Sequence, residues 1–65
     1  MKTARRTILS IIDEHDGPVP ITGVVDAALG KHEPTAVFEA FAALIREGEI
    51  YEPETNHVRR TVRGE

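Results

Sequence analysis

The fold of this chain is decided by the stretch EPTAVFEAFAALIREG, residues 33–48. Pro34 suits the first position of a helix, because the N–H that proline lacks would have no partner there. Gly48 suits the position just after a helix, where a left-handed backbone is common. Apolar residues between them recur at helical spacing within an arc of about 100°. This stripe, which includes both phenylalanines, is predicted to face the core: Val37, Phe38, Phe41, Leu44 and Ile45.

A first helix is predicted from residue 3 to about residue 15, ended by Gly17 and Pro18. Its apolar stripe is Ala4, Ile8, Leu9, Ile11 and Ile12. Residues 19–21, Val-Pro-Ile, follow as a short extended segment. Because proline cannot donate to a central strand, this segment is expected to be an edge strand or a brace, and it could supply a third strand.

A second helix is predicted over residues 23–29, capped by Thr22 and ended by Gly30. Its inward positions are expected to be Val25, Ala28 and Leu29. A short helix, a tight turn and the longer helix of residues 33–48 together form the arrangement of a helix-turn-helix.

The C-terminal part is predicted to form a hairpin. Residues 49–53 and 57–62 are rich in β-branched and aromatic side chains, and residues 54–56 between them are turn formers. The order helix, short strand, helix, helix, hairpin is that of a winged helix-turn-helix in the α+β class. Residues 1–65 are therefore expected to form a single winged-helix domain, with residues 62–65 fraying at its end.

Composition restricts the protein class. A chain of 65 residues makes one small domain with a thin core. It has no cysteine, so neither disulfides nor thiolate metal sites are available. No apolar run approaches the roughly 18 residues of a membrane span. We expect a cytoplasmic protein with no membrane partner.

Positive charge is concentrated at the two ends of a chain whose net charge is −3. Residues 7–57 carry ten acidic side chains against Lys31 and Arg46. A chain-wide basic field that attracts nucleic acid is therefore absent. The basic residues of the ends either meet in the fold as a local patch or are ordinary solvated termini: Lys2, Arg5, Arg6, Arg59, Arg60 and Arg63.

Enzyme chemistry has little support in the sequence. His15, His32 and His57 fall in three separate turns or element ends, without the spacing of a metal site. Ser10 lies on a helix beside apolar neighbours, so a Ser/His/Asp arrangement is not indicated. We expect no catalytic residue, no metal, no cofactor and no small-molecule substrate.

Reading of DNA by the third helix is disfavoured. A helix in the major groove usually presents Arg, Lys, Asn or Gln to base edges, mostly from its N-terminal end. The face opposite the apolar stripe offers only Arg46, which lies at the C-terminal end. Glu33, Glu39 and Glu47 would meet phosphate charge.

Two candidate surfaces remain. The first is basic: Arg59 and Arg60, with Lys2, Arg5, Arg6 and Arg46 as further candidates, could hold a phosphate backbone weakly and with strong salt dependence. Successive strand residues point to opposite faces, so Arg59 and Arg60 are not expected to line one side. The alternative is that they protect an edge strand from pairing with other chains.

The second surface is a ridge of small residues on the third helix, formed by Ala36, Ala40 and Ala43 with Glu47 at its end. Small side chains would let another helix approach closely. The alternative is that alanine serves helix propensity alone. Tyr51 on the hairpin is either core or an interface anchor, and partial burial is expected.

Three segments carry a resemblance to a known family: residues 17–21, 46–53 and 57–61. The chain resembles the winged-helix domain at the C-terminus of archaeal minichromosome-maintenance (MCM) replicative helicases. That family tends to have a Gly-Pro-Val-Pro-Ile-like brace, then Glu-Gly-Glu-Ile-Tyr-Glu-Pro and a short strand ending in arginine or threonine. The similarity covers about residues 4–61. The winged-helix domain of the middle subunit of replication protein A, which binds proteins, has a similar hairpin entry.

The resemblance implies an interaction or regulatory module of DNA replication, with weak nonspecific nucleic-acid contact at most. Its partners would be the replication machinery or a second copy. The family domain is normally the tail of a large ATPase, and this sequence contains no phosphate-binding loop. We therefore expect either an excised domain or a free-standing protein of the same fold. The alternative function is a free-standing winged-helix transcriptional regulator that dimerises and binds DNA through its basic wing and N-terminus.

Overall fold

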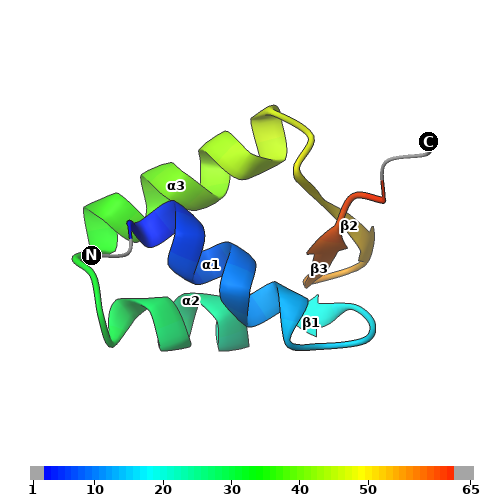
Figure 1. Ribbon diagram of the computed structural model, residues 1–65, viewed down its shortest axis with the longest axis horizontal. Helices are drawn as coiled ribbons and strands as arrows, with labels where there is room; N and C mark the ends of the chain where they lie inside the picture. Colours follow the sequence, from blue (N-terminus) through cyan, green and yellow to red (C-terminus); the bar gives the residue numbers. More distant parts are fainter. Residues whose placement is uncertain (1–2, 63–65) are drawn as a thin grey trace.

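A computed structural model of the chain describes residues 3–62. It has the α+β architecture of a winged helix: three helices, a short strand before the second helix, and a C-terminal antiparallel hairpin (Figure 1). The elements in order are α1 (Ala4–Asp13), β1 (Val19–Pro20), α2 (Ile21–Leu29), α3 (Pro34–Arg46), β2 (Ile50–Glu54) and β3 (His57–Arg60). The predicted fold class is confirmed.

The start of α1 and both ends of α3 follow their local sequence signals, whereas α1 ends at Asp13, earlier than the predicted residue 15. The side chain of Thr3 accepts a hydrogen bond from the backbone N–H of Arg6 and so caps α1. Pro34 occupies the first turn of α3, as predicted. At the other end Gly48 has φ +79°, its N–H donates to the carbonyl of Ile45, and the N–H of residue 49 donates to that of residue 44. These two bonds are the Schellman pattern, which satisfies two of the last carbonyls of the helix.

The second helix begins earlier than predicted. It starts at Ile21, Pro20 occupies the N-cap position, and no side-chain cap is present, so the prediction of Thr22 as the cap was wrong. The physical reason lies in the hairpin, because the N–H of Ile21 donates to the carbonyl of Asn56 at 2.8 Å. A partner more than thirty residues away thus satisfies an N–H at the start of the helix, where a local cap was expected.

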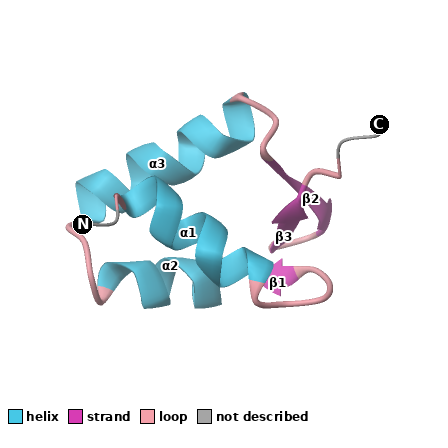
Figure 2. Cartoon of the chain, viewed as in Figure 1, coloured by secondary structure: helices cyan, strands magenta, loops and turns pink. Residues whose placement is uncertain are grey.

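The three strands form one sheet in the order β1-β3-β2, drawn at one end of the molecule in Figure 2. Val19 pairs with Val58 and Pro20 with His57 on β3, which confirms a third, edge strand for residues 19 and 20, whereas Ile21 already belongs to α2. The hairpin turns through residues 55 and 56, and Asn56 takes a positive φ of 63°, which asparagine tolerates. The register of β2 against β3 shifts between Tyr51 and Glu54, a stretch that contains Pro53.

The core is assembled from all six elements. Its fully or almost fully buried apolar residues are Ile8, Ile12, Val19, Val24, Ala28, Val37, Leu44, Ile50 and Val58. In α2 it is Val24 and Ala28 that are buried, whereas Val25 and Leu29 pack partly against this cluster. Five further apolar side chains of the helices do the same: Leu9, Ile11, Ile21, Ala40 and Phe41.

The predicted inward stripe of α3 is correct for Val37 and Leu44, which are buried, and for Phe41, which packs against the core. It is wrong for Phe38 and Ile45, which are 55% and 41% exposed. The buried arc of α3 is rotated toward Ala40, which packs against the core. The hydrophobic pattern favoured Phe38 over Ala40 as an inward position, because phenylalanine is the larger apolar side chain. In the structure it is the small side chain of Ala40 that packs against the core.

Within residues 3–62 no helix is long and apolar enough to cross a membrane. Val62, the last residue described, is 79% exposed. The expectation of fraying for residues 63–65 lies outside the described part of the chain.

Candidate interaction surface

The outer side of α3 carries exposed apolar side chains. Phe38 and Ile45 are exposed, and so is Ala42 between them. Glu39 and Arg46 lie beside them on the same helix and are also exposed. We call these five residues the α3 face. In Figure 1, α3 lies along one edge of the molecule, and α1 contacts it from the inner side.

The N-terminal end of α3 offers little to a DNA base edge. Its N-cap is Glu33, and the first helical residues, Pro34, Thr35 and Ala36, are exposed. None of these side chains is Arg, Lys, Asn or Gln, which make the common base contacts in the major groove. Arg46 lies in the last turn, where its positive charge interacts favourably with the negative end of the helix dipole.

The predicted ridge of small residues lies partly inside the molecule. Ala36 is exposed, whereas Ala40 and Ala43 are half-buried. Glu47, at the end of the ridge, forms an ion pair and a hydrogen bond with Arg5 of α1. Through this pair, α1 of the same chain contacts the C-terminal end of the ridge. Tyr51 on β2 is 44% exposed and pairs across the hairpin with Arg59.

The described basic candidates differ in their contacts, and two of them form ion pairs. Arg5 is held by Glu47, and the hydrogen bond from Arg5 lowers the pKa of the Glu47 carboxyl below its ordinary value while it raises the pKa of Arg5. Arg60 donates from Nη1 to Oδ2 of Asp13 at 2.9 Å. Both carboxylates lie more than forty residues from their arginines in sequence, so the sequence pattern gave no signal of either pair.

Three of the candidate cations form no ion pair within residues 3–62: Arg6, Arg46 and Arg59. The charge of Arg46 nevertheless helps to lower the pKa of the neighbouring Glu47 carboxyl. They lie on α1, α3 and β3 respectively. Lys2, the sixth candidate for nucleic-acid contact, is outside the described residues. Within the described part of the chain, three guanidinium groups without an ion pair thus lie on three different elements.

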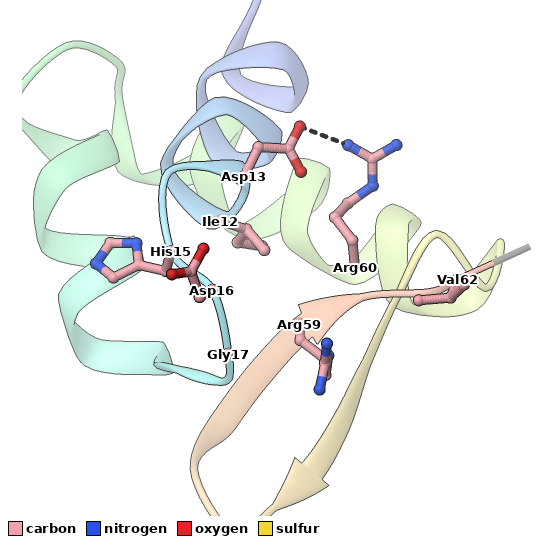
Figure 3. A pocket seen from close by; sticks show the side chains of 8 residues that line it. All are labelled: Ile12, Asp13, His15, Asp16, Gly17, Arg59, Arg60 and Val62. Atoms are coloured by element: carbon pink, nitrogen blue, oxygen red, sulfur yellow. Dashed lines mark hydrogen bonds and ion pairs between the residues drawn. The ribbon is translucent and has the colours of Figure 1, made fainter.

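A hollow of about 140 Å³ lies between the end of α1 and β3 (Figure 3). Its lining is Ile12, Asp13, His15, Asp16, Gly17, Arg59, Arg60 and Val62. Figure 3 shows Arg60 turned toward Asp13 while Arg59 points the other way, as strand alternation predicts. The Nε of Arg60 is buried and has no hydrogen-bond partner among residues 3–62. The hollow is well below the roughly 300 Å³ at which small-molecule sites begin.

The three histidines are held by local or structural contacts. Nδ1 of His15 donates to the carbonyl of Ile11 at 3.0 Å, and Nδ1 of His57 donates to the carbonyl of Thr55 at 2.9 Å. Nε2 of His32 lies 2.8 Å from Oγ1 of the buried Thr7, so it ties the turn before α3 to α1. No group of three His, Cys, Asp or Glu side chains that could hold a metal occurs in the described residues.

Comparison with known proteins leaves the chain without a match: no family model, no curated protein and no solved structure is similar enough to be counted as one. The family resemblance drawn from residues 17–21, 46–53 and 57–61 therefore stays a prediction. What the geometry itself provides is a winged-helix scaffold with one partly apolar, exposed helix face.

Proposed function

We propose that this chain is a winged-helix interaction or regulatory module of DNA replication, which acts in the cytoplasm by docking onto protein. The observation that supports docking most directly is the exposure of Phe38 and Ile45 on α3. Helix-turn-helix proteins place this helix in the DNA groove, where polar side chains are needed. Here the same helix offers large apolar side chains to a partner.

Burial of apolar surface and electrostatics both support the same proposal. Burying an apolar side chain against another protein removes it from water, at about 25 cal/mol for each Å². A DNA backbone would not provide that burial and would bring phosphates close to Glu39 and Glu33. Two of the candidate cations, Arg5 and Arg60, already neutralise acidic side chains of this chain. Nucleic-acid contact is therefore expected to be weak and independent of sequence.

The second candidate function is that of a free-standing winged-helix regulator that binds DNA. Its specific support is the presence of three guanidinium groups that form no ion pair within residues 3–62: Arg6, Arg46 and Arg59. If all three contacted phosphates, the slope of log affinity against log salt would be about −2.7, or about −0.9 for each contact. Raising the salt fourfold would then weaken binding about 40-fold.

Titration of a fluorescent duplex at about 50 mM and about 200 mM salt separates the two functions. We expect dissociation constants weaker than about 10 µM at the higher salt, within the usual range of nonspecific binding. Submicromolar binding there, lost in Arg59→Gln with Arg46→Gln, would support the regulator and overturn the interaction module. Arg60→Gln is a poor probe, because it also removes the ion pair with Asp13.

The association with replication comes from the resemblance to the helicase family, and it needs its own test. A purified archaeal MCM helicase is mixed with the labelled chain at about 100 µM, a concentration that detects binding free energies of about −5.5 kcal/mol or stronger. Co-sedimentation, or a change in DNA unwinding by the helicase, is the expected result. If neither occurs, replication is removed from the proposal and an interaction module of another process remains.

A further inference from the structure

We infer that the polypeptide that covers the α3 face is a second copy of this chain, docked so that the two α3 helices run antiparallel about a twofold axis. The inference rests on the proposed function, since it names the partner of the same face. It comes from the order of side chains along the helix, and its centre is Ala42.

The α3 face consists of two parallel rows. Phe38 and Ile45 are seven residues apart, which is close to two full turns, so they lie on one line along the helix about 10.5 Å apart. Glu39 and Arg46 are also seven residues apart and form a second line, about 100° further round. Ala42 lies between the lines and near the middle of both, and it is exposed.

This pattern is complementary to itself. When a second α3 is placed antiparallel with its Ala42 opposite the first, a twofold axis brings Phe38 of each chain to Ile45 of the other. The same axis brings Glu39 of each chain to Arg46 of the other, so two opposite-charge pairs form beside two apolar contacts. A twofold interface uses one patch twice and requires such self-complementarity. A parallel arrangement would leave the charge rows on opposite sides of the interface, without these pairs.

Ala42 sets how closely the helices approach. Interaxial distances between packed helices are about 8–10 Å and depend on the side chains at the contact. A methyl group at the centre allows the short end of that range. A long side chain at residue 42 would separate the helices and break both rows of contacts at once.

Association is expected to be weak in the isolated domain. Stable interfaces bury about 800 Å² on each partner, whereas the α3 face presents only five side chains, of which Phe38 and Ile45 are the large apolar ones. We expect a dissociation constant between about 100 µM and 1 mM, at the weak end of the affinity scale. The charge pairs lie at the rim, so added salt should weaken the dimer further.

Sedimentation equilibrium from about 20 µM to about 2 mM tests the dimer, a range that brackets the expected constant. The decisive variant is Ala42→Arg, which should leave the chain monomeric throughout the range. Its matched control is Ala36→Arg, which adds the same charge at an exposed alanine of the same helix outside the α3 face. The control should dimerise like the native chain. Native protein that is monomeric at about 2 mM would overturn the inference, and so would equal dimerisation of the two variants.

Charge reversal tests the antiparallel arrangement. Glu39→Arg alone places two like charges together at each pair, as does Arg46→Glu alone, and each should weaken the dimer at least about tenfold. The double variant restores opposite charges and should return to within about threefold of the native constant. Failure of the double variant to recover would overturn the antiparallel pairing.

The two proposals can fail separately. A monomeric chain with weak DNA binding would overturn the twofold dimer and leave the interaction module in place. Submicromolar DNA binding would overturn the interaction module, whatever the state of association.

Discussion

At the scale of single residues, Gly48 shows how one backbone angle ends the main helix. Its φ of +79° lies in the left-handed region, and an added Cβ would meet no atom within 4 Å. A substitution there is therefore costly because of backbone conformation and not because of a clash. We expect Gly48→Ala to lower the free energy of unfolding by about 1 kcal/mol, the penalty of the left-handed region for an L-residue.

Gly23 is the matched control for this prediction. It lies inside α2, where a Cβ also meets nothing within 4 Å, and its φ is not positive. Gly23→Ala should raise the free energy of unfolding by about 0.5 kcal/mol, since alanine loses less backbone entropy in a helix. Urea denaturation of both variants measures the difference. Equal effects at residues 23 and 48 would contradict the conformational explanation.

At the scale of elements, the pair of Arg5 and Glu47 links the start of α1 to the end of α3. The hydrogen bond from Arg5 is the main cause of the lowered pKa of Glu47, with the charges of Arg5 and Arg46 adding to it against desolvation. A lowered folded-state pKa contributes stability that is present above the unfolded value, about 4.5, and lost as the pH falls through the folded value. The link between the two helices should therefore weaken in acid.

A carboxyl-detected NMR titration of Glu47 measures this effect. The pKa of Glu47 should lie below 4.5 in the native chain and rise toward it in Arg5→Gln. Arg6→Gln is the control, because Arg6 has the same charge one residue away and no ion pair in the described residues. Equal pKa values of Glu47 in the two variants would show that Arg5 is not the cause.

The helices and strands also show how much of the fold could be predicted from the sequence. Elements with their own stop and start residues were predicted well: Pro34 and Gly48 delimit α3, and the two hairpin strands lie close to their expected bounds. What failed depended on contacts distant in sequence. The start of α2 is satisfied by the carbonyl of Asn56, and the buried arc of α3 is turned toward Ala40.

The prediction of the candidate site also failed where it depended on contacts distant in sequence. The sequence pattern indicated α3 as a candidate interaction surface, but it predicted Phe38 and Ile45 to be buried and the ridge of alanines to be exposed. Helical periodicity defines an apolar arc and cannot say which part of a wide arc a small domain is able to cover. The spacing of Phe38 and Ile45 beside Glu39 and Arg46 was available in the sequence. That spacing indicates an interface only when this side of α3 is known to be exposed.

At the scale of the whole molecule, the last strand of the chain is the centre of the sheet. β3 lies between β1 and β2, and Val58 on it is fully buried opposite Val19. β3 also contacts α1, and the hairpin turn before it holds the start of α2. No two-stranded part of this sheet would be stable alone in water. The domain should therefore unfold as one unit.

The variant Val58→Ala tests whether the domain unfolds as one unit. Removing two buried methyl groups from the central strand should cost about 2 kcal/mol, by transfer and cavity terms. In a chain of this size the core supplies only about 3–5 kcal/mol, and each kcal/mol shifts the melting temperature by about 4–8 °C. The midpoint should fall by about 8–16 °C, measured by circular dichroism for the helices and by the fluorescence of Tyr51, the only tyrosine, for β2.

Val62→Ala is the control, because Val62 is exposed, and it should stay within about 0.5 kcal/mol of the native chain. Helices that persist after the tyrosine signal has melted would contradict unfolding as one unit, and they would show that the three helices hold together without the sheet.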